Sequence, residues 1–423
     1  MKNNITMLHS LNKHKLLALL ELLFLMILSC SEVEVGEDWV TYRHDNRRSG
    51  VTSENLNIQN LHELWSYTSP GPPQPAWAGP AKWDAYAKVS ALRSMRNYDM
   101  VFHVIVAGNN LYFGSSVEDA VLCLDTGNGK ERWAYITDGP VRIVPAFADG
   151  NIYFGSDDGY AYCVDAHQGL LIWKYKPSPE EPLIPNNGKF ISQWPIRTGV
   201  LVEPRRAIFG ASLLPWKESY LCALDSEFGS PEAPGCYTVT LENKTLEGAL
   251  LASTGRLFAT QGRVPPAVFD AADGKLLGEL TGGGGVFAII TPESRVLHGP
   301  GNKTGWITES DQEKFGKIAQ YPLGNAIIAV GDMYYVLTDT YLTAIYRTTK
   351  EKMWKSECRF PFSLILAGNT LFAGGDREVA AFNALNGEKL WSADVDGKAY
   401  GLAAAHGKLF VSTDTGSIFC YGL

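Results

Sequence analysis

Charged and aromatic side chains gather in and beside two long segments in the first half of the chain. Planar guanidinium groups bind carboxylates and sulfates through paired hydrogen bonds, and aromatic rings beside them hold cations and flat ligand faces. This combination suits a carboxylated or sulfated sugar, or an anionic peptide tail. The candidate ligand-binding residues are Arg142, Arg197, Trp194, His103, Asp99, Arg96, Asp157 and Asp158.

Two other interpretations of these residues stay open. An acid–base cluster of His103, Asp99, Asp157, Arg142 and Tyr98 would suit a polysaccharide lyase or hydrolase. Alternatively, residues 69–102 pack as a lid whose arginines pair with nearby aspartates. The sequence contains no GxSxG, HExxH or P-loop pattern. No catalytic residue can therefore be assigned, and a binding function is favoured over an enzymatic one.

An internal repeat must position these residues. Each copy has an aromatic segment such as Leu111-Tyr-Phe-Gly-Ser115, and a Trp follows eight residues after an Asp or its equivalent. The copies recur about every 37–40 residues, and each indicates four short strands joined by Gly, Asn and Asp turns. Four-stranded units at this period predict the blades of a β-propeller. Five tryptophans are expected to pack one blade on the next, namely Trp65, Trp133, Trp173, Trp354 and Trp391.

The number of copies predicts a closed ring. Seven copies run from residue 104 to about residue 393, and an eighth, 397–423, ends after three strands. Residues 61–67 supply the missing strand and leave no exposed strand edge. We therefore predict an all-β fold, an eight-bladed β-propeller of four-stranded antiparallel blades over residues 61–423. Seven blades are the alternative, because the fifth copy is degenerate.

The alternation of strands places the loops on two faces of the ring. Most long insertions fall on the face that carries the second-to-third loops and the connections between blades, and residues 69–102 and 177–197 are the longest. Binding sites often lie in loops on a rigid scaffold. Arg142 and Arg197 begin innermost strands and should point toward the central channel. We therefore place the predicted site at the channel mouth near the first three blades.

The first thirty residues resemble a bacterial lipoprotein signal peptide. Three lysines precede the apolar run 16–28, and Cys30 follows an aliphatic and a small residue in the manner of a lipobox. Thirteen residues are too few to span a bilayer comfortably. The resemblance implies that residues 1–29 are removed and that Cys30 is lipidated. Residues 30–60 are then expected to form a tether or, as the alternative, to pack against the ring through Trp39 and Tyr42. The protein would be exported and anchored to the outer membrane, on its periplasmic or surface face; an uncleaved anchor or an ordinary signal peptide is the alternative.

Composition excludes some classes of function. The net charge is −8, from 37 basic and 45 acidic residues, and no basic block occurs, so nucleic-acid binding is disfavoured. Cys123, Cys163 and Cys420 occupy equivalent repeat positions and are expected in the core. Cys222 and Cys236 are close enough to pair, and their state stays open. No CxxC or CxxCH occurs, so haem attachment and common zinc sites lack support, and no metal is expected.

The Asp-x-x-x-Gly-x-x-x-Trp pattern at Asp125 and Asp165 resembles the PQQ-type, or quinoprotein-like, propeller repeat. The segments Asp38-Trp39 and Arg48-Ser49-Gly50 also resemble the opening of bacterial PQQ-like repeat proteins. A short exported chain with eight blades and a lipobox is similar to the BamB lipoprotein family. This resemblance covers residues 38–423 and implies a role near outer-membrane protein assembly.

Dehydrogenases with this repeat hold PQQ and Ca²⁺ at the propeller centre, often beside a vicinal disulfide. This chain is much shorter and has no adjacent cysteine pair, so neither PQQ nor Ca²⁺ is expected. Asp157-Asp158 is a possible metal site, but Ser-Asp-Asp-Gly is also an ordinary turn. The favoured function is a monomeric, non-catalytic binding or scaffold protein whose partner is an envelope protein or an anionic glycan. The alternatives are a polysaccharide-active enzyme and, less favoured, a PQQ-dependent dehydrogenase.

Overall fold

The computed structural model describes residues 36–423 apart from 78–82, 85–88, 91–97 and 302–305. The expected signal peptide, Cys30 and Arg96 lie outside the described residues. Within that part of the chain, no helix has the length and apolar character needed to cross a membrane.

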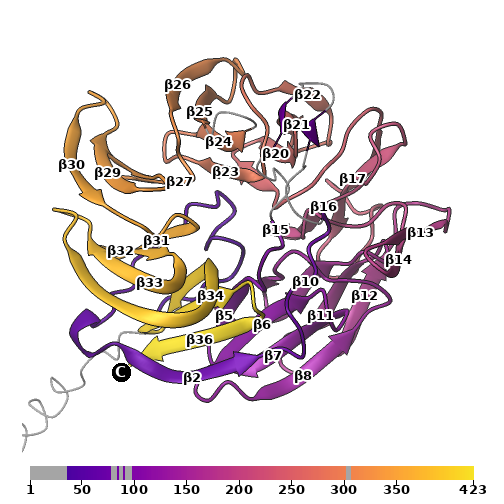
Figure 1. The fold of residues 1–423 in the computed structure, drawn as a ribbon. Helices are drawn as coiled ribbons and strands as arrows, with labels where there is room; N and C mark the ends of the chain where they lie inside the picture. The colour runs from indigo at the N-terminus through magenta and orange to yellow at the C-terminus, as the bar shows by residue number, and fades with distance from the viewer. Residues whose placement is uncertain (1–35, 78–82, 85–88, 91–97, 302–305) are drawn as a thin grey trace, which may run out of the picture. The chain divides into compact units, whose positions relative to one another are not determined.

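Eight antiparallel blades follow one another along the chain (Figure 1). The first four blades consist of β5 (Val104–Ala107), β6 (Asn110–Ser115), β7 (Ala120–Asp125) and β8 (Glu131–Ile136), then β9 (Ala146–Ala148), β10 (Asn151–Gly155), β11 (Ala161–Asp165) and β12 (Leu171–Tyr175), then β15 (Leu201–Glu203), β16 (Arg206–Ala211), β17 (Ser219–Asp225) and β18 (Tyr237–Leu241), then β19 (Leu251–Ser253), β20 (Arg256–Gln261), β21 (Val264–Asp270) and β22 (Leu276–Glu279).

The other blades complete the ring. They consist of β23 (Phe287–Ile290), β24 (Arg295–Gly301), β25 (Trp306–Asp311) and β26 (Lys317–Tyr321), then β27 (Ala326–Val330), β28 (Met333–Leu337), β29 (Tyr341–Tyr346) and β30 (Lys352–Glu357), then β31 (Ser363–Ala367), β32 (Thr370–Gly374), β33 (Asp376–Asn383) and β34 (Lys389–Ala405), which continues into the eighth blade with β35 (Lys408–Thr413), β36 (Ser417–Gly422) and β2 (His62–Thr68). The smaller elements are β1 (Val51–Thr52), a 3₁₀ turn at Ile58–Asn60, β3 (Trp83–Asp84), β4 (Val89–Ser90), β13 (Leu183–Asn186) and β14 (Lys189–Ser192).

The N-terminal strand β2 pairs antiparallel with the C-terminal strand β36, with Trp65 opposite Cys420. The two strands lie side by side in Figure 1. The eighth blade is thus assembled from both ends of the described chain. The predicted eight-bladed all-β propeller is confirmed.

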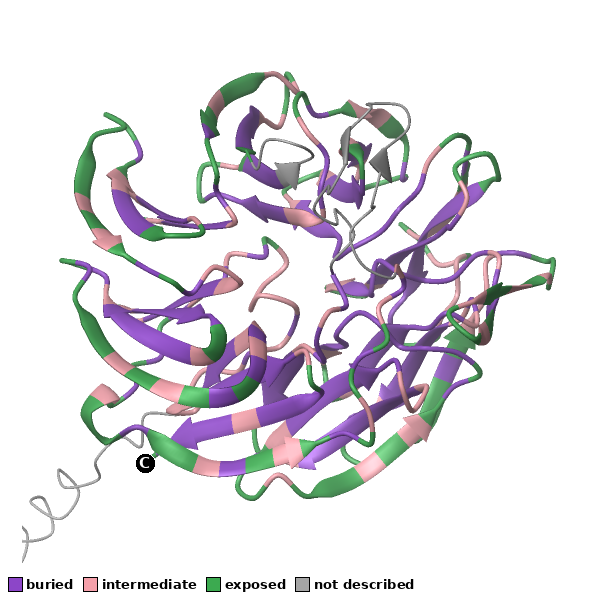
Figure 2. Ribbon diagram, viewed as in Figure 1, coloured by how far each residue is buried: buried purple, intermediate pink, exposed green. Residues whose placement is uncertain are grey.

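Burial follows the distance of each strand from the channel. Every residue of β5 is buried, and so is every residue of β7 except the last, Asp125, which is partly exposed. The burial arises because each sheet lies between two neighbouring sheets. The outermost strands β8 and β30 alternate between exposed and partly buried residues (Figure 2). The cysteines at the equivalent repeat positions are buried, and Cys222 and Cys236 are free thiols rather than a disulfide.

A tryptophan–glycine contact joins neighbouring blades. The Trp133 indole lies against Gly169 of the next blade, and its Nε1–H donates to the carbonyl of Ala166 at 3.2 Å. A Cβ at Gly169 would stand 2.6 Å from that ring, and its φ of 69° also favours glycine. The other four tryptophans likewise donate to a carbonyl of the following blade, in the pairs Trp65–Thr126, Trp173–Ser226, Trp354–Ala384 and Trp391–Leu61.

The degenerate copies use substitutes for this contact. Between the fourth and fifth blades the roles are exchanged, because Gly278 stands at the tryptophan position and the Phe315 ring covers it. Between the fifth and sixth blades Ala319 stands at the tryptophan position, and Lys350 replaces the glycine. The Lys350 ammonium extends to the fully buried carboxylate of Glu309 at 3.1 Å. The weak sequence signal there marks a different packing solution, not a missing blade.

The segment expected as a tether is packed into the ring from residue 37 onward. We call residues 37–54 the N-terminal plug. Its backbone and side chains form hydrogen bonds with seven of the eight blades within the described residues, through the pairs Trp39–Val106, Val40–Phe147, Asn46–Val202, Asn46–Ala252, Arg47–Ile290, Gly50–Leu366 and Glu54–Gly407. These contacts pair polar groups on the channel edge of the innermost strands.

Two glycines of the second blade test the docking contact. Gly150 and Gly169 both have positive φ, but a Cβ at Gly150 meets nothing within 4 Å. We expect Gly150→Ala to cost about 1–2 kcal/mol of unfolding free energy through backbone strain. Gly169→Ala should cost about 1–3 kcal/mol more, because the Trp133 ring must also move. Urea unfolding measures both, and equal losses would contradict the docking role of Gly169.

The buried carboxylate of Glu309 should make stability depend on pH. Burial alone would raise its pKa, but hydrogen bonds from Arg295, Tyr321 and Lys350 outweigh burial and hold the pKa below the ordinary value. A carboxylate with a lowered folded pKa stabilises the fold above its unfolded pKa and loses that contribution as pH falls. Glu309→Gln should therefore flatten the decline in urea midpoint between about pH 6 and 3. The exposed Glu357→Gln is the control, and an unchanged slope in Glu309→Gln would refute this expectation.

Candidate functional site

Arg142 and Arg197 meet at one carboxylate. Each stands four residues before an innermost strand, β9 or β15, so the repeat brings both to the channel mouth. Asp157 Oδ1 accepts from Arg197 Nε at 2.8 Å, and Oδ2 accepts from Arg197 Nη2 at 2.8 Å and Arg142 Nε at 2.6 Å. All three side chains are at most 2% exposed.

The insertion after β2 supplies a second carboxylate. Asp99 Oδ2 lies 3.0 Å from Arg142 Nη1 and accepts from the backbone N–H of Ala76 at 2.7 Å. The carbonyl of Gln74 accepts another bond from Arg142 Nη1. Both described ends of the insertion therefore contribute acceptors to this arginine. We call Arg142, Arg197, Asp157 and Asp99 the mouth cluster.

The electrostatics of the mouth cluster follow from burial and pairing. Burial alone would raise the pKa of Asp157, but the Arg197 and Arg142 guanidinium groups outweigh it and lower the pKa below the ordinary value. Burial raises the pKa of Asp99 despite its contact with Arg142. Burial likewise raises the pKa of Tyr98 well above the usual phenol value. The buried positive charges are thus balanced inside the protein.

Most donors of the two arginines are therefore occupied by protein acceptors. Arg197 Nη1 is buried and has no hydrogen-bond partner within the described residues, but the Trp77 ring lies 5.9 Å from the guanidinium carbon. An anionic ligand would have to displace Asp99 or Asp157 to reach these groups. The arginines of the insertion lie outside the described residues, so the interpretation of residues 69–102 as a lid stays a prediction.

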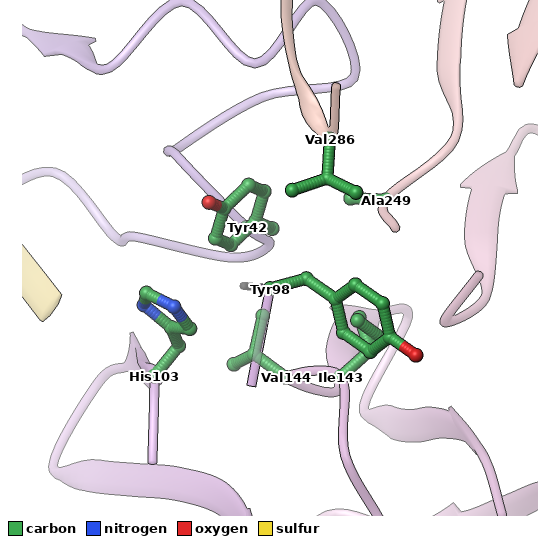
Figure 3. Close-up of a pocket in the computed structure, with 7 residues that line it drawn as sticks. All are labelled: Tyr42, Tyr98, His103, Ile143, Val144, Ala249 and Val286. Atoms are coloured by element: carbon green, nitrogen blue, oxygen red, sulfur yellow. The ribbon is translucent and has the colours of Figure 1, made fainter. Parts of the chain in front are cut away.

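His103 lies apart from the mouth cluster, on the wall of a small cavity in the channel. Figure 3 shows the lining side chains, which are Tyr42, Tyr98, His103, Ile143, Val144, Ala249 and Val286. The Tyr42 ring of the plug meets the His103 ring edge-on, with centroids 5.1 Å apart. Burial, with a contribution from Arg43, lowers the pKa of His103 to about 4. The imidazole is therefore neutral near pH 7, and the cavity has room for about one water molecule.

The remaining candidates have structural partners. Trp194 Nε1–H donates to the carbonyl of Glu218 at 2.7 Å. Asp158 accepts from the Tyr162 hydroxyl at 2.6 Å and the Tyr160 N–H at 2.9 Å, so its carboxylate holds a turn rather than joining Asp157. Within the described residues no group of three His, Cys, Asp or Glu side chains could hold a metal. Arg96 lies outside the described residues.

Sequence reasoning missed one member of this region. Glu247 is fully buried and accepts from the Trp77 Nε1–H at 3.1 Å. Like Arg142 and Arg197, it stands four residues before an innermost strand, here β19. Aligning the connections between blades, rather than the strands alone, would have placed Glu247 beside the two arginines.

Comparisons with known proteins agree with this architecture. Residues 99–186 match a family model described as "Outer membrane protein assembly factor BamB", and no curated protein matches the chain. The quinohemoprotein alcohol dehydrogenase from Comamonas testosteroni superposes with a TM-score of 0.62 and 14% identity, over 91% of this chain and 80% of that chain. A europium-containing methanol dehydrogenase superposes with a TM-score of 0.61 and 13% identity, over 91% of this chain and 98% of that chain. BamB from Moraxella catarrhalis superposes with 15% identity over 86% of this chain and 98% of that chain. Its TM-score of 0.41 is too low to establish a shared fold.

These identities establish the fold alone, a β-propeller, and residues 99–186 are similar to the PQQ-like repeats of the BamB family model. The cavity beside His103 accommodates about one water molecule, and its lining is mostly apolar. The guanidinium groups of Arg142 and Arg197 are paired with Asp157 and Asp99.

Removing the shared carboxylate should destabilise the fold. Asp157→Asn leaves two buried guanidinium groups without their main counter-charge, so we expect a loss of about 3–5 kcal/mol of unfolding free energy. The nearby exposed Asp138→Asn should change stability by less than about 0.5 kcal/mol. Urea unfolding measures both variants. A stable Asp157→Asn protein would show that the mouth cluster is not needed for folding.

Proposed function

We propose that this chain is a non-catalytic scaffold protein of the bacterial envelope that binds a protein partner on the rim beside its second and third blades. The observation that carries the proposal is a set of large apolar side chains on firmly held loops of the mouth face. Leu183 is 62% exposed, Phe190 69% and Trp216 72%. Arg142, Arg197 and Asp157 behind them are buried and paired, which favours the outer rim as the binding surface.

The β13–β14 hairpin presents two of these side chains. Its register places Leu183 opposite Ser192 and Pro185 opposite Phe190, so Leu183, Pro185 and Phe190 share one face. The hairpin is held in place because Lys189 forms an ion pair with Asp119 of the first blade. Large apolar side chains on a rigid support are typical of the centres of protein interfaces.

The loop after β16 carries the third side chain. Trp216 lies two residues from Glu218, whose carbonyl accepts the hydrogen bond from Trp194 at the end of the 177–197 insertion. The two loops are therefore joined at this rim. A single exposed apolar residue has no special meaning, but three on joined loops favour a binding surface.

The cellular location is proposed from the N-terminal sequence and the family match. The lipobox-like sequence supports a lipid anchor at Cys30 in the outer membrane, and the matched family is described as an outer-membrane assembly factor. We propose a monomer that binds an envelope protein and needs no redox cofactor. Capture of an anionic glycan, or polysaccharide cleavage, is less favoured because Asp99, Asp157 and Arg142 are sealed from solvent.

Photo-crosslinking in cells tests the proposed rim. A crosslinker at position 183 should capture a discrete protein, and Phe190→Ser with Trp216→Ala should reduce that product about thirty-fold, because interface anchors contribute 2 kcal/mol or more. Leu323→Ser is the matched control, since this 67% exposed leucine lies between the fifth and sixth blades. An unchanged product in the double variant, or an equal loss in the control, would overturn the proposal.

A further inference from the structure

We infer that the face of the propeller that carries the N-terminal plug lies against the lipid surface of the membrane, while the mouth face points away from it. The inference rests on the proposed lipid anchor at Cys30. It assigns one surface of the molecule to a bilayer and leaves the opposite rim free for a protein partner.

The start of the plug is fixed at one face of the ring. Asp38 Oδ1 accepts from the N–H of Gly108 at 2.7 Å and lies 2.7 Å from His406 Nε2. Gly108 lies in the turn between β5 and β6, and His406 lies in the turn between β34 and β35. Glu37 is held by the Thr52 hydroxyl at 2.6 Å. The folded part of the chain therefore begins at these turns, close to the innermost strands.

The chain length limits where the lipid can be. Cys30 and Glu37 are seven residues apart, so a fully extended segment reaches at most about 25 Å. A flexible segment of that length has a mean reach of about 15 Å. These limits follow from residue count alone and need no particular conformation of the segment.

The mouth face lies beyond that reach. To reach the mouth face, the segment between Glu37 and Cys30 must first pass from an innermost to an outermost strand. That is three strand spacings, about 14 Å. It must then follow the length of an outer strand such as β8, whose six residues span about 20 Å. The total of about 34 Å exceeds the 25 Å maximum. The mouth face therefore cannot rest on the bilayer that holds the lipid at Cys30.

The plug face also carries suitable side chains. The turns before the outermost strands expose Leu170 at 61%, Phe228 at 70% and Leu385 at 61%. These turns lie on the plug face because Thr126, in the equivalent turn of the first blade, donates to the carbonyl of Asn109 in the turn that follows β5. Contact with lipid would bury these apolar side chains, which is energetically favourable.

Two positions on one strand distinguish the two faces. Lys130 and Ile136 are both exposed and flank β8 (Glu131–Ile136), Lys130 on the plug face and Ile136 on the mouth face. The lipidated full-length protein, with Cys236→Ser to remove the partly exposed thiol, would carry a nitroxide at Lys130→Cys or Ile136→Cys. Each form is bound to phosphatidylethanolamine–phosphatidylglycerol vesicles that contain a nickel-chelating lipid. We expect nickel to enhance relaxation of the label at position 130 at least several-fold more than at position 136.

The controls separate this inference from the proposed anchor. Flotation with the vesicles should be lost in Cys30→Ser, and flotation that does not depend on Cys30 would refute the anchor together with the orientation. If flotation depends on Cys30 but both labels respond equally, the ring stands on its edge and the inferred orientation is wrong. A stronger response at position 136 would reverse the assignment.

Discussion

The free inner edge of each blade is the constraint on which this structure depends. An innermost strand has a neighbour on only one side, so its channel edge presents polar backbone groups. The N-terminal plug forms hydrogen bonds with seven of the eight blades, and β2 then supplies the outermost strand of the eighth. One continuous stretch of about thirty residues thus joins the ring from inside and closes it from outside. Changes in this stretch should therefore affect several blades rather than one.

Blade-to-blade packing shows how one contact can be replaced without changing the fold. Among the described residues, four of the eight interfaces use a tryptophan that covers a glycine of the next blade. Where Gly278 stands at the tryptophan position, Phe315 fills the space from the opposite side, and where Ala319 stands there, the Lys350–Glu309 pair does so. Close packing requires only that the volume be filled and buried polar groups be paired. The repeat can therefore fade in sequence while the ring stays regular.

Charged residues at the mouth are not necessarily available to bind a ligand. Arg142 and Arg197 have the chemistry of an anion site, yet Asp157 and Asp99 occupy most of their donors. We therefore propose the outer rim around the β13–β14 hairpin as the binding surface. A binding rim on the mouth face and a lipid tether on the plug face place the two proposed contacts on opposite sides of the ring.

The repeat, its period, the eight blades and the docking role of residues such as Trp133 could all be read from the chain, because strand alternation and turn chemistry are local. Which charges pair could not. Asp99 and Arg142 are 43 residues apart, and nothing local in the sequence pairs them. Packing of the plug against the ring was one of two open alternatives, because its partners come from seven blades spread along the chain. Long-range pairing decides whether an arginine meets a ligand or a carboxylate of its own chain, and only the folded structure brings those groups together.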